Sequence, residues 1–180
     1  YEQNYILNRD HFEWVAEQKN YANHVHSGRY QLTDGMTNAE LIDLLRSGTQ
    51  SEVKVVFNNV RTLAQLAGTV SKQIEPDSLA VIQALLDPAT LQKYGFNEAT
   101  FPAMFVPNTY QFNWDSSVEQ FVSRMAREFK DFWTPERLAK AKKLGLQQSQ
   151  VCTLASIVQE ETASSKDADV IAGVYLNRIR

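Results

Sequence analysis

The chain has 180 residues, of which 43% are hydrophobic and 22% are charged, and its formal net charge at pH 7 is −3. This length and composition fit one domain or two small ones with a buried core, and they exclude a collagen-like, disulfide-stapled or disordered protein. The negative charge argues against nucleic-acid binding, which needs clustered cations, and we interpret the basic cluster of Lys140, Lys142 and Lys143 as a solvated helix face.

The segment 1–60 carries the signals of a compact α+β unit. Thr37 and Glu40 form a capping-box pair, and apolar residues at helical spacing follow until Gly48. Strand and helix signals alternate around this helix, so that the apolar faces of the elements can cover one another. The expected elements are a helix over 10–18, a strand over 29–32, a helix after Thr37 and a strand over 53–57.

From residue 62 onward the pattern is mainly helical. Apolar stripes at helical spacing begin at Leu63 and at Leu79. Residues 101–114 interrupt the helical rhythm with two prolines and several aromatic side chains, which indicates an extended segment or loop. The expected later helices cover 118–133, 135–143, 151–162 and 167 to the end. Because the last pattern stops at Arg180 without a Gly or Pro to close it, we expect the sequence to be incomplete at this end.

Glu161 is a candidate acid because it lies near the apolar side of the helix expected over 151–162. On a helical wheel Glu160 lies roughly opposite, so the two neighbouring glutamates have different surroundings. A carboxyl group in apolar surroundings has a raised pKa and holds a proton near neutral pH, as a general acid requires. The alternative is a structural role, in which Glu161 lies at the edge of the apolar face and either extends its side chain outward or pairs with an arginine such as Arg178.

Asn177 falls on the apolar side of the last expected helix, which Val170 and Val174 mark. A buried amide must be hydrogen-bonded, so Asn177 either orients Glu161 or binds substrate, or it caps a neighbouring loop. The three histidines all lie before Ser27 and lack the helical spacing of a zinc pair, so we expect no metal site. The chain also lacks a Gly-rich phosphate loop, and we expect no cofactor.

The segment 154–180 carries a specific motif, LASIVQEETASSKDADVIAGVYLNRIR. It resembles the signature of the YceG-like (MltG-type) endolytic peptidoglycan transglycosylases, in which Ala-Ser-Ile-Val precedes Glu-Thr and Asn-Arg-Leu follows further along. Ile179 stands in place of the leucine. The resemblance implies that Glu161 is the catalytic acid and base. It also implies supporting or substrate-binding roles for the residues that match the rest of the motif, which include Ser156, Thr162, Asn177 and Arg178.

A second segment, FVPNTY over 105–110, resembles the family's Phe-x-Pro-Asp-Thr-Tyr segment near the active cleft. This likeness implies supporting or substrate-binding roles for Asn108, Thr109 and Tyr110, although Asn108 stands where the family has Asp and cannot carry its charge. Residues 28–48 resemble the LysM-like portion that precedes the catalytic domain. The implied fold is α+β, with a small LysM-like subdomain over 1–60 followed by a mainly helical, incomplete part of the YceG-type catalytic domain over 61–180.

The resemblance implies an endolytic murein transglycosylase, a lyase that cleaves peptidoglycan glycan strands after N-acetylmuramic acid and terminates or trims nascent strands. One carboxyl group suffices for this chemistry: it protonates the glycosidic oxygen and then deprotonates the C6 hydroxyl of the same sugar, which attacks C1 and leaves a 1,6-anhydro end. In this family the cleft includes segments that follow the position of Arg180. The resemblance therefore implies that the incomplete chain can be inactive by itself.

The resemblance also implies a place in the cell envelope. Family members are single-pass proteins of the bacterial inner membrane, anchored by an N-terminal helix that is absent from this chain, and this part would face the periplasm. The implied partners are peptidoglycan glycan strands and cell-wall synthesis proteins. The rival interpretation is a non-catalytic peptidoglycan-binding or scaffolding module of the cell-wall synthesis machinery.

Overall fold

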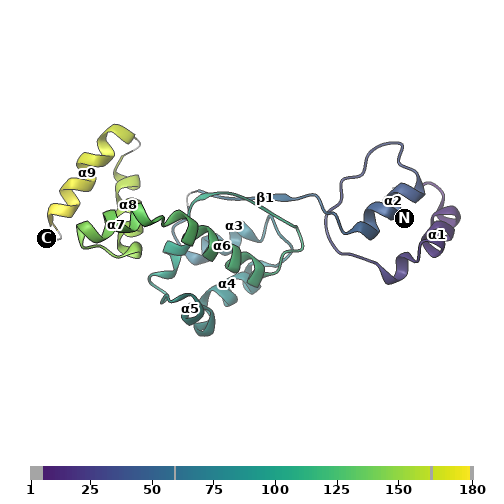
Figure 1. The fold of residues 1–180 in the computed structure, drawn as a ribbon, viewed down its shortest axis with the longest axis horizontal. Helices are drawn as coiled ribbons and strands as arrows, with labels where there is room; N and C mark the ends of the chain where they lie inside the picture. The colour runs from purple at the N-terminus through teal and green to yellow at the C-terminus, as the bar shows by residue number, and fades with distance from the viewer. Residues whose placement is uncertain (1–5, 59, 163, 179–180) are drawn as a thin grey trace. The chain divides into compact units, whose positions relative to one another are not determined.

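The computed structural model of the protein describes residues 6–58, 60–162 and 164–178. Helices predominate, and the strands of the described chain form a two-stranded antiparallel sheet, which confirms the α+β class (Figure 1). The elements in chain order are α1 (Arg9–Gln18), η1 (Tyr21–Asn23), α2 (Asn38–Ser47), β1 (Val53–Phe57), α3 (Leu63–Val70), α4 (Ser78–Leu86), α5 (Pro88–Tyr94), η2 (Phe101–Met104), β2 (Asn108–Phe112), α6 (Val118–Phe132), α7 (Pro135–Leu144), α8 (Gln148–Glu161) and α9 (Ser165–Arg178).

Two compact units make up the chain. The first comprises Tyr1–Val81 with Asn108–Val118, and the second comprises Ile82–Pro107 with Glu119–Arg180. This division differs from the expected one at residue 60 because β1, which lies before that point, pairs with β2, which lies far after it. The identities of 1–60 as a LysM-like subdomain and of 61–180 as part of a catalytic domain stay predictions.

Helices α1 and α2 pack against each other in the first unit, and both begin at side-chain caps. Asn8 caps α1, because its Oδ1 accepts a hydrogen bond from the His11 N–H at 2.9 Å. The predicted capping box of α2 is confirmed, with the Thr37 N–H donating to Glu40 at 2.8 Å. The core that the two helices share consists of Phe12, Val15, Leu41 and Ile42.

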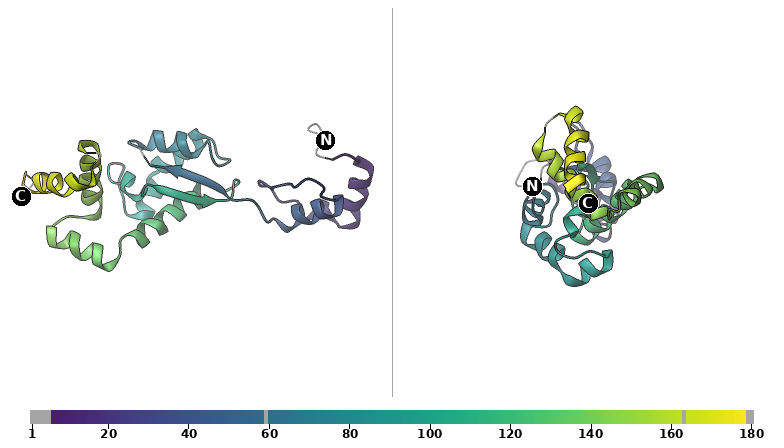
Figure 2. Two further views of the ribbon diagram at one scale, coloured as in Figure 1. Left: turned by 90° about the horizontal axis from the view of Figure 1, so that it is seen from above. Right: turned by 90° about the vertical axis from the view of Figure 1, so that its left-hand side faces the viewer.

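The strand expected over 29–32 is absent, and the chain there has no regular secondary structure. The backbone of this segment is linked to the chain before β1 by the Ser51 N–H, which donates a hydrogen bond to the Arg29 carbonyl oxygen at 2.7 Å. The sheet is instead built from β1 and β2, which run side by side in Figure 2. Their register sets Val55 opposite Tyr110. Alternate residues of β1 are buried against α3, as expected for a strand with one covered face. The interpretation of residues 101–114 as extended is thus confirmed for β2, whereas η2 is helical.

Aromatic side chains form the core of the second unit. The ring centroid of Phe101 lies 5.2 Å from that of Phe105 in an edge-to-face contact, and Phe105 stacks on Phe121 at 6.1 Å. Phe96 contacts both Phe101 and Phe129. These rings join η2 to α6 and give α8 a fixed surface on which to pack. The basic cluster on α7 is exposed, as predicted, and its Lys140 pairs with Glu136 one turn earlier.

Candidate active site

Glu161 is the last residue of α8, and neighbouring parts of the second unit hold this helix in place. Val158, one turn before Glu161, is buried. Further up the helix, the thiol of Cys152 lies 3.8 Å from the Ala103 carbonyl oxygen of η2, and burial raises the pKa of this thiol. The side chain of Glu161 is exposed, so the apolar surroundings predicted from the wheel are not formed in this chain. The wheel gives the side of the helix on which a residue lies, whereas coverage of that side depends on tertiary contacts.

Tyr175 of α9 holds the carboxylate of Glu161. Its hydroxyl donates a hydrogen bond to Glu161 Oε1 at 2.9 Å, and this bond raises the pKa of Tyr175 above its ordinary value of 10.0. The guanidinium carbon of Arg178 lies 5.9 Å from the centroid of the Tyr175 ring. The sequence prediction missed Tyr175, because the packing of α8 on α9 brings the two residues together and no helical spacing links them.

Ser156 and Thr162 make local hydrogen bonds. The Ser156 hydroxyl donates to the Thr153 carbonyl oxygen at 2.7 Å, within its own helix. Thr162 is the C-cap of α8, and its hydroxyl oxygen accepts from the Ser164 N–H at 2.9 Å.

The apolar side of α9 is largely exposed in this chain. Val170 and Val174 are 68% and 45% exposed, and Asn177, which the wheel placed on the same side, is also exposed. The prediction that Asn177 is buried is therefore wrong for the described chain, because an amphipathic pattern marks a face suited to burial without supplying the element that covers it. Ile179 lies outside the described residues.

Asn108, Thr109 and Tyr110 belong to β2 in the first unit, whereas Glu161 belongs to the second. Tyr110 is 4% exposed, and its ring stacks on Phe57 of β1 with centroids 5.4 Å apart. Asn108 and Thr109 are exposed, and Asn108 Oδ1 accepts a hydrogen bond from the Thr109 N–H at 2.8 Å. The ring of Tyr110 thus helps to form the core, and the two exposed residues are the ones that a ligand can reach.

Neither a metal cluster nor a membrane-spanning helix is found in the described part of the chain. Within residues 6–58, 60–162 and 164–178, no group of three or more His, Cys, Asp or Glu side chains is placed to hold a metal ion. None of the helices in these ranges combines the length and the apolar character that crossing a membrane requires.

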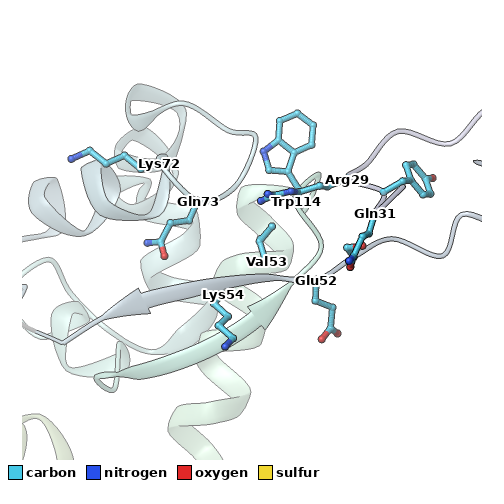
Figure 3. A pocket seen from close by; sticks show the side chains of 10 residues that line it. Arg29, Gln31, Glu52, Val53, Lys54, Lys72, Gln73 and Trp114 are labelled. Carbon is cyan, nitrogen blue, oxygen red and sulfur yellow. The ribbon is translucent and has the colours of Figure 1, made fainter. Parts of the chain in front are cut away.

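An open hollow of about 740 Å³ lies in the first unit, beside the start of β1 (Figure 3). Sequence analysis did not single it out, because its residues come from four separate stretches of the chain without a shared spacing. Cationic and aromatic side chains are prominent in its lining. The lining residues are Arg29, Tyr30, Gln31, Ser51, Glu52, Val53, Lys54, Lys72, Gln73 and Trp114.

The motif at the end of α8 and the α+β fold agree with the resemblance found in the sequence, and comparison with known proteins identifies the family. The model of the YceG-like family matches residues 1–180, and the chain belongs to this family. A crystal structure of a yceG-like protein from Listeria monocytogenes superimposes with a TM-score of 0.61 at 20% identity, covering 95% of this chain and 61% of that one. This likeness shows a shared fold.

Two curated relatives carry the name endolytic murein transglycosylase. The Bacillus subtilis protein is 25% identical over 185 residues, which cover 94% of this chain and 51% of the relative. The protein of Streptococcus pneumoniae strain D39 is 25% identical over 195 residues, covering 93% of this chain and 35% of the relative. The chain therefore spans about half the length, or less, of the curated relatives that it matches.

Proposed function

We propose that the chain is part of an endolytic murein transglycosylase that cleaves peptidoglycan glycan strands after N-acetylmuramic acid, forms a 1,6-anhydro end, and so terminates or trims nascent strands. The observation that carries the proposal is Glu161, which occupies the glutamate of the family motif and has its carboxylate held by Tyr175 at 2.9 Å. Membership of the YceG-like family and the names of its relatives support the same reaction class.

The proposed reaction moves one proton in each of two steps through Glu161. In the first step its carboxyl group donates a proton to the glycosidic oxygen, the C1–O bond breaks, and the leaving sugar keeps the proton as a hydroxyl group. In the second step the C6 hydroxyl of the muramic sugar attacks C1 and gives its proton to the Glu161 carboxylate. The acid is regenerated and water is not consumed. Attack by a tethered hydroxyl group has the positional advantage of an intramolecular reaction.

The hydrogen bond from Tyr175 fits this cycle, since it fixes the direction of one carboxylate oxygen, Oε1, and leaves the other to exchange the proton. Asn177 and Arg178 are exposed on the next helix, where a glycan strand can reach them, and we assign them to substrate binding. Ser156 and Thr162 support α8 and its C-terminal end through their hydrogen bonds. We assign supporting or substrate-binding roles to Asn108, Thr109 and Tyr110 by their motif.

We further propose that the complete protein is anchored in the bacterial inner membrane by a single N-terminal helix, with this part facing the periplasm. The names of the curated relatives place their action on murein, which supports a location in the cell envelope. Cell-wall synthesis proteins are the proposed protein partners.

The test is digestion of purified sacculi by the full-length protein, with the products analysed by mass spectrometry. The parent protein is expected to release 1,6-anhydro muropeptides, and Glu161→Gln is expected to release almost none. Glu160→Gln is the matched control, because it removes the neighbouring carboxylate from the same helix and should retain activity. Equal product from the parent and from Glu161→Gln would refute the assignment.

The second candidate function is a non-catalytic peptidoglycan-binding or scaffolding module. The exposure of Glu161 in this chain favours it, because a general acid usually lies in a site that excludes water. The same digestion distinguishes the two functions: a scaffolding module binds sacculi equally well with and without the Glu161→Gln substitution, and yields no 1,6-anhydro product in either form.

A further inference from the structure

The hollow beside β1 exposes an unpaired strand edge. The side-chain amide of Gln73 accepts a hydrogen bond from the Val56 N–H at 2.8 Å and donates one to the Val56 carbonyl oxygen at 3.3 Å, so these backbone groups point away from β2. Backbone groups of alternate residues point to the same edge of a strand, and those of Lys54 therefore point this way too. Lys54 lines the hollow, and within the described chain no side chain covers its backbone groups as Gln73 covers those of Val56.

The walls of the hollow are held in place by hydrogen bonds. The carbonyl oxygen of Trp114 accepts from the Glu75 N–H at 2.8 Å, which fixes the loop after β2. Asp115, the next residue, accepts from Gln50 Nε2 at 2.9 Å and from the Ser27 hydroxyl at 2.8 Å, and so ties the segment that carries Arg29 to the same loop. Partial burial alone would raise the pKa of Asp115, but these two hydrogen bonds hold it below its ordinary value. The site is thus formed before any ligand arrives.

The charge of the hollow favours an anionic ligand. Arg29 and Lys72 line it, whereas the side chains of Lys54 and Glu52 extend to the opposite side of β1 from Val53 and Trp114 (Figure 3). Neither Arg29 nor Lys72 has a carboxylate within 4.0 Å among the residues that the structure describes. Guanidinium and ammonium groups without an internal partner are suited to charge-assisted hydrogen bonds with carboxylates.

We propose that this hollow binds the carboxylate-bearing stem peptide of a peptidoglycan strand, paired in extended form with the free edge of β1 at Lys54. Peptide addition to an exposed strand edge is a known mode of recognition. The carboxylates of the stem peptide lie against Arg29 and Lys72, and a sugar ring packs on Trp114. A volume of about 740 Å³ suits a small ligand of this kind, whereas a folded partner needs a much larger surface. The choice of peptidoglycan as the source of the peptide rests on the proposed function.

The test measures binding to the Glu161→Gln form of the chain by isothermal titration calorimetry, so that no turnover disturbs the titration. One ligand is a disaccharide-peptide muropeptide, and the other is the same disaccharide with its peptide removed. The muropeptide is expected to bind at least about tenfold more tightly, because only it brings backbone groups and carboxylates to the hollow. Equal affinity for the two ligands overturns the proposal.

Matched variants locate the binding. Lys72→Glu is expected to weaken muropeptide binding about tenfold or more, whereas Lys142→Glu on the exposed face of α7 leaves it unchanged. Trp114→Ala is likewise expected to weaken it, in contrast to Trp14→Ala, which removes an exposed ring on α1.

The strand edge is tested by two substitutions at one position. Lys54→Ala removes the charge and keeps the N–H, and Lys54→Pro removes both. Because this N–H points away from β2, proline leaves the sheet pairing intact, and circular dichroism checks that the fold is retained. Lys54→Pro is expected to bind the muropeptide several-fold more weakly than Lys54→Ala. Equal affinity of the two variants contradicts pairing at the edge.

Two further outcomes separate this inference from its rivals. A linear acidic peptide of L-amino acids that binds as tightly as the muropeptide overturns the proposal, because the hollow would then recognise a segment of a partner protein. If sacculus digestion shows no role for Glu161 but the muropeptide binds with the expected dependence on Lys72 and Trp114, the proposed catalytic function fails and the assignment of the hollow stands.

Discussion

Gly28 lies beside Gln50 at the wall of the hollow, where the positive φ and the close approach of the Gln50 side chain leave no room for the Cβ of alanine. Its φ is +137°, and a Cβ added there would lie 2.1 Å from Cδ of Gln50 and 2.3 Å from its Oε1. The backbone conformation alone is unfavourable for alanine by about 1–3 kcal/mol. Gln50 must also move and give up its hydrogen bonds to Asp115, which contribute about 1.5 kcal/mol at a half-exposed site. We expect Gly28→Ala to lower the free energy of unfolding by about 2.5–4.5 kcal/mol.

Urea unfolding followed by far-UV circular dichroism measures this loss, and Gly35→Ala is the matched control. Gly35 has a φ of +82°, and no atom lies within 4 Å of a Cβ added there, so its substitution by alanine introduces backbone strain alone, about 1–2 kcal/mol. In a Gln50→Ala background the contact is removed, and Gly28→Ala should then lose only as much stability as the control. The reasoning fails if Gly28→Ala and Gly35→Ala are equally destabilising in the parent chain.

The remaining predictions concern the candidate site, the hydrogen bonds of Asp115 and the N-cap of α2. Tyr175→Phe in the full-length protein is expected to lower the rate of 1,6-anhydro product release, because Glu161 loses the hydrogen bond that orients it; product analysis over time measures this rate, and an unchanged rate removes Tyr175 from the mechanism. The pKa of Asp115 is lower in the folded protein than its unfolded value of about 3.8. The ionised carboxylate therefore stabilises the fold above about pH 3.8, and this stabilisation is lost as the pH falls through the pKa of the folded protein. Asp115→Asn should make the free energy of unfolding, measured with urea, less dependent on pH in this acidic range. Thr37→Ala is expected to reduce stability by about 1 kcal/mol through loss of the N-cap, whereas Thr37→Ser should retain most of it, as thermal unfolding can show.

The helices follow from local signals in the sequence. The capping box of Thr37 and Glu40, the prolines at the start of α5 and α7, and the glycines after α2, α5 and α7 set helix ends through hydrogen bonds and backbone preferences that act over short stretches of chain. The strand expected over 29–32 failed for the opposite reason. A strand needs a second strand with which to form hydrogen bonds. β1 pairs with β2, which lies far along the chain in a segment that the sequence indicated only as extended or loop.

The candidate site divides in the same way. Glu161 could be singled out from the sequence, because its position on the helix and its motif are local properties of the chain. The sequence could not predict the hydrogen bond between Glu161 and Tyr175 or the exposure of Glu161. Nor could it predict the hollow that is lined by Lys54, Lys72 and Trp114. Each of these depends on packing between segments that no short-range spacing connects. The sequence by itself determined that most of the chain is helical and which glutamate carries the family motif, and tertiary packing alone decided what each side chain meets.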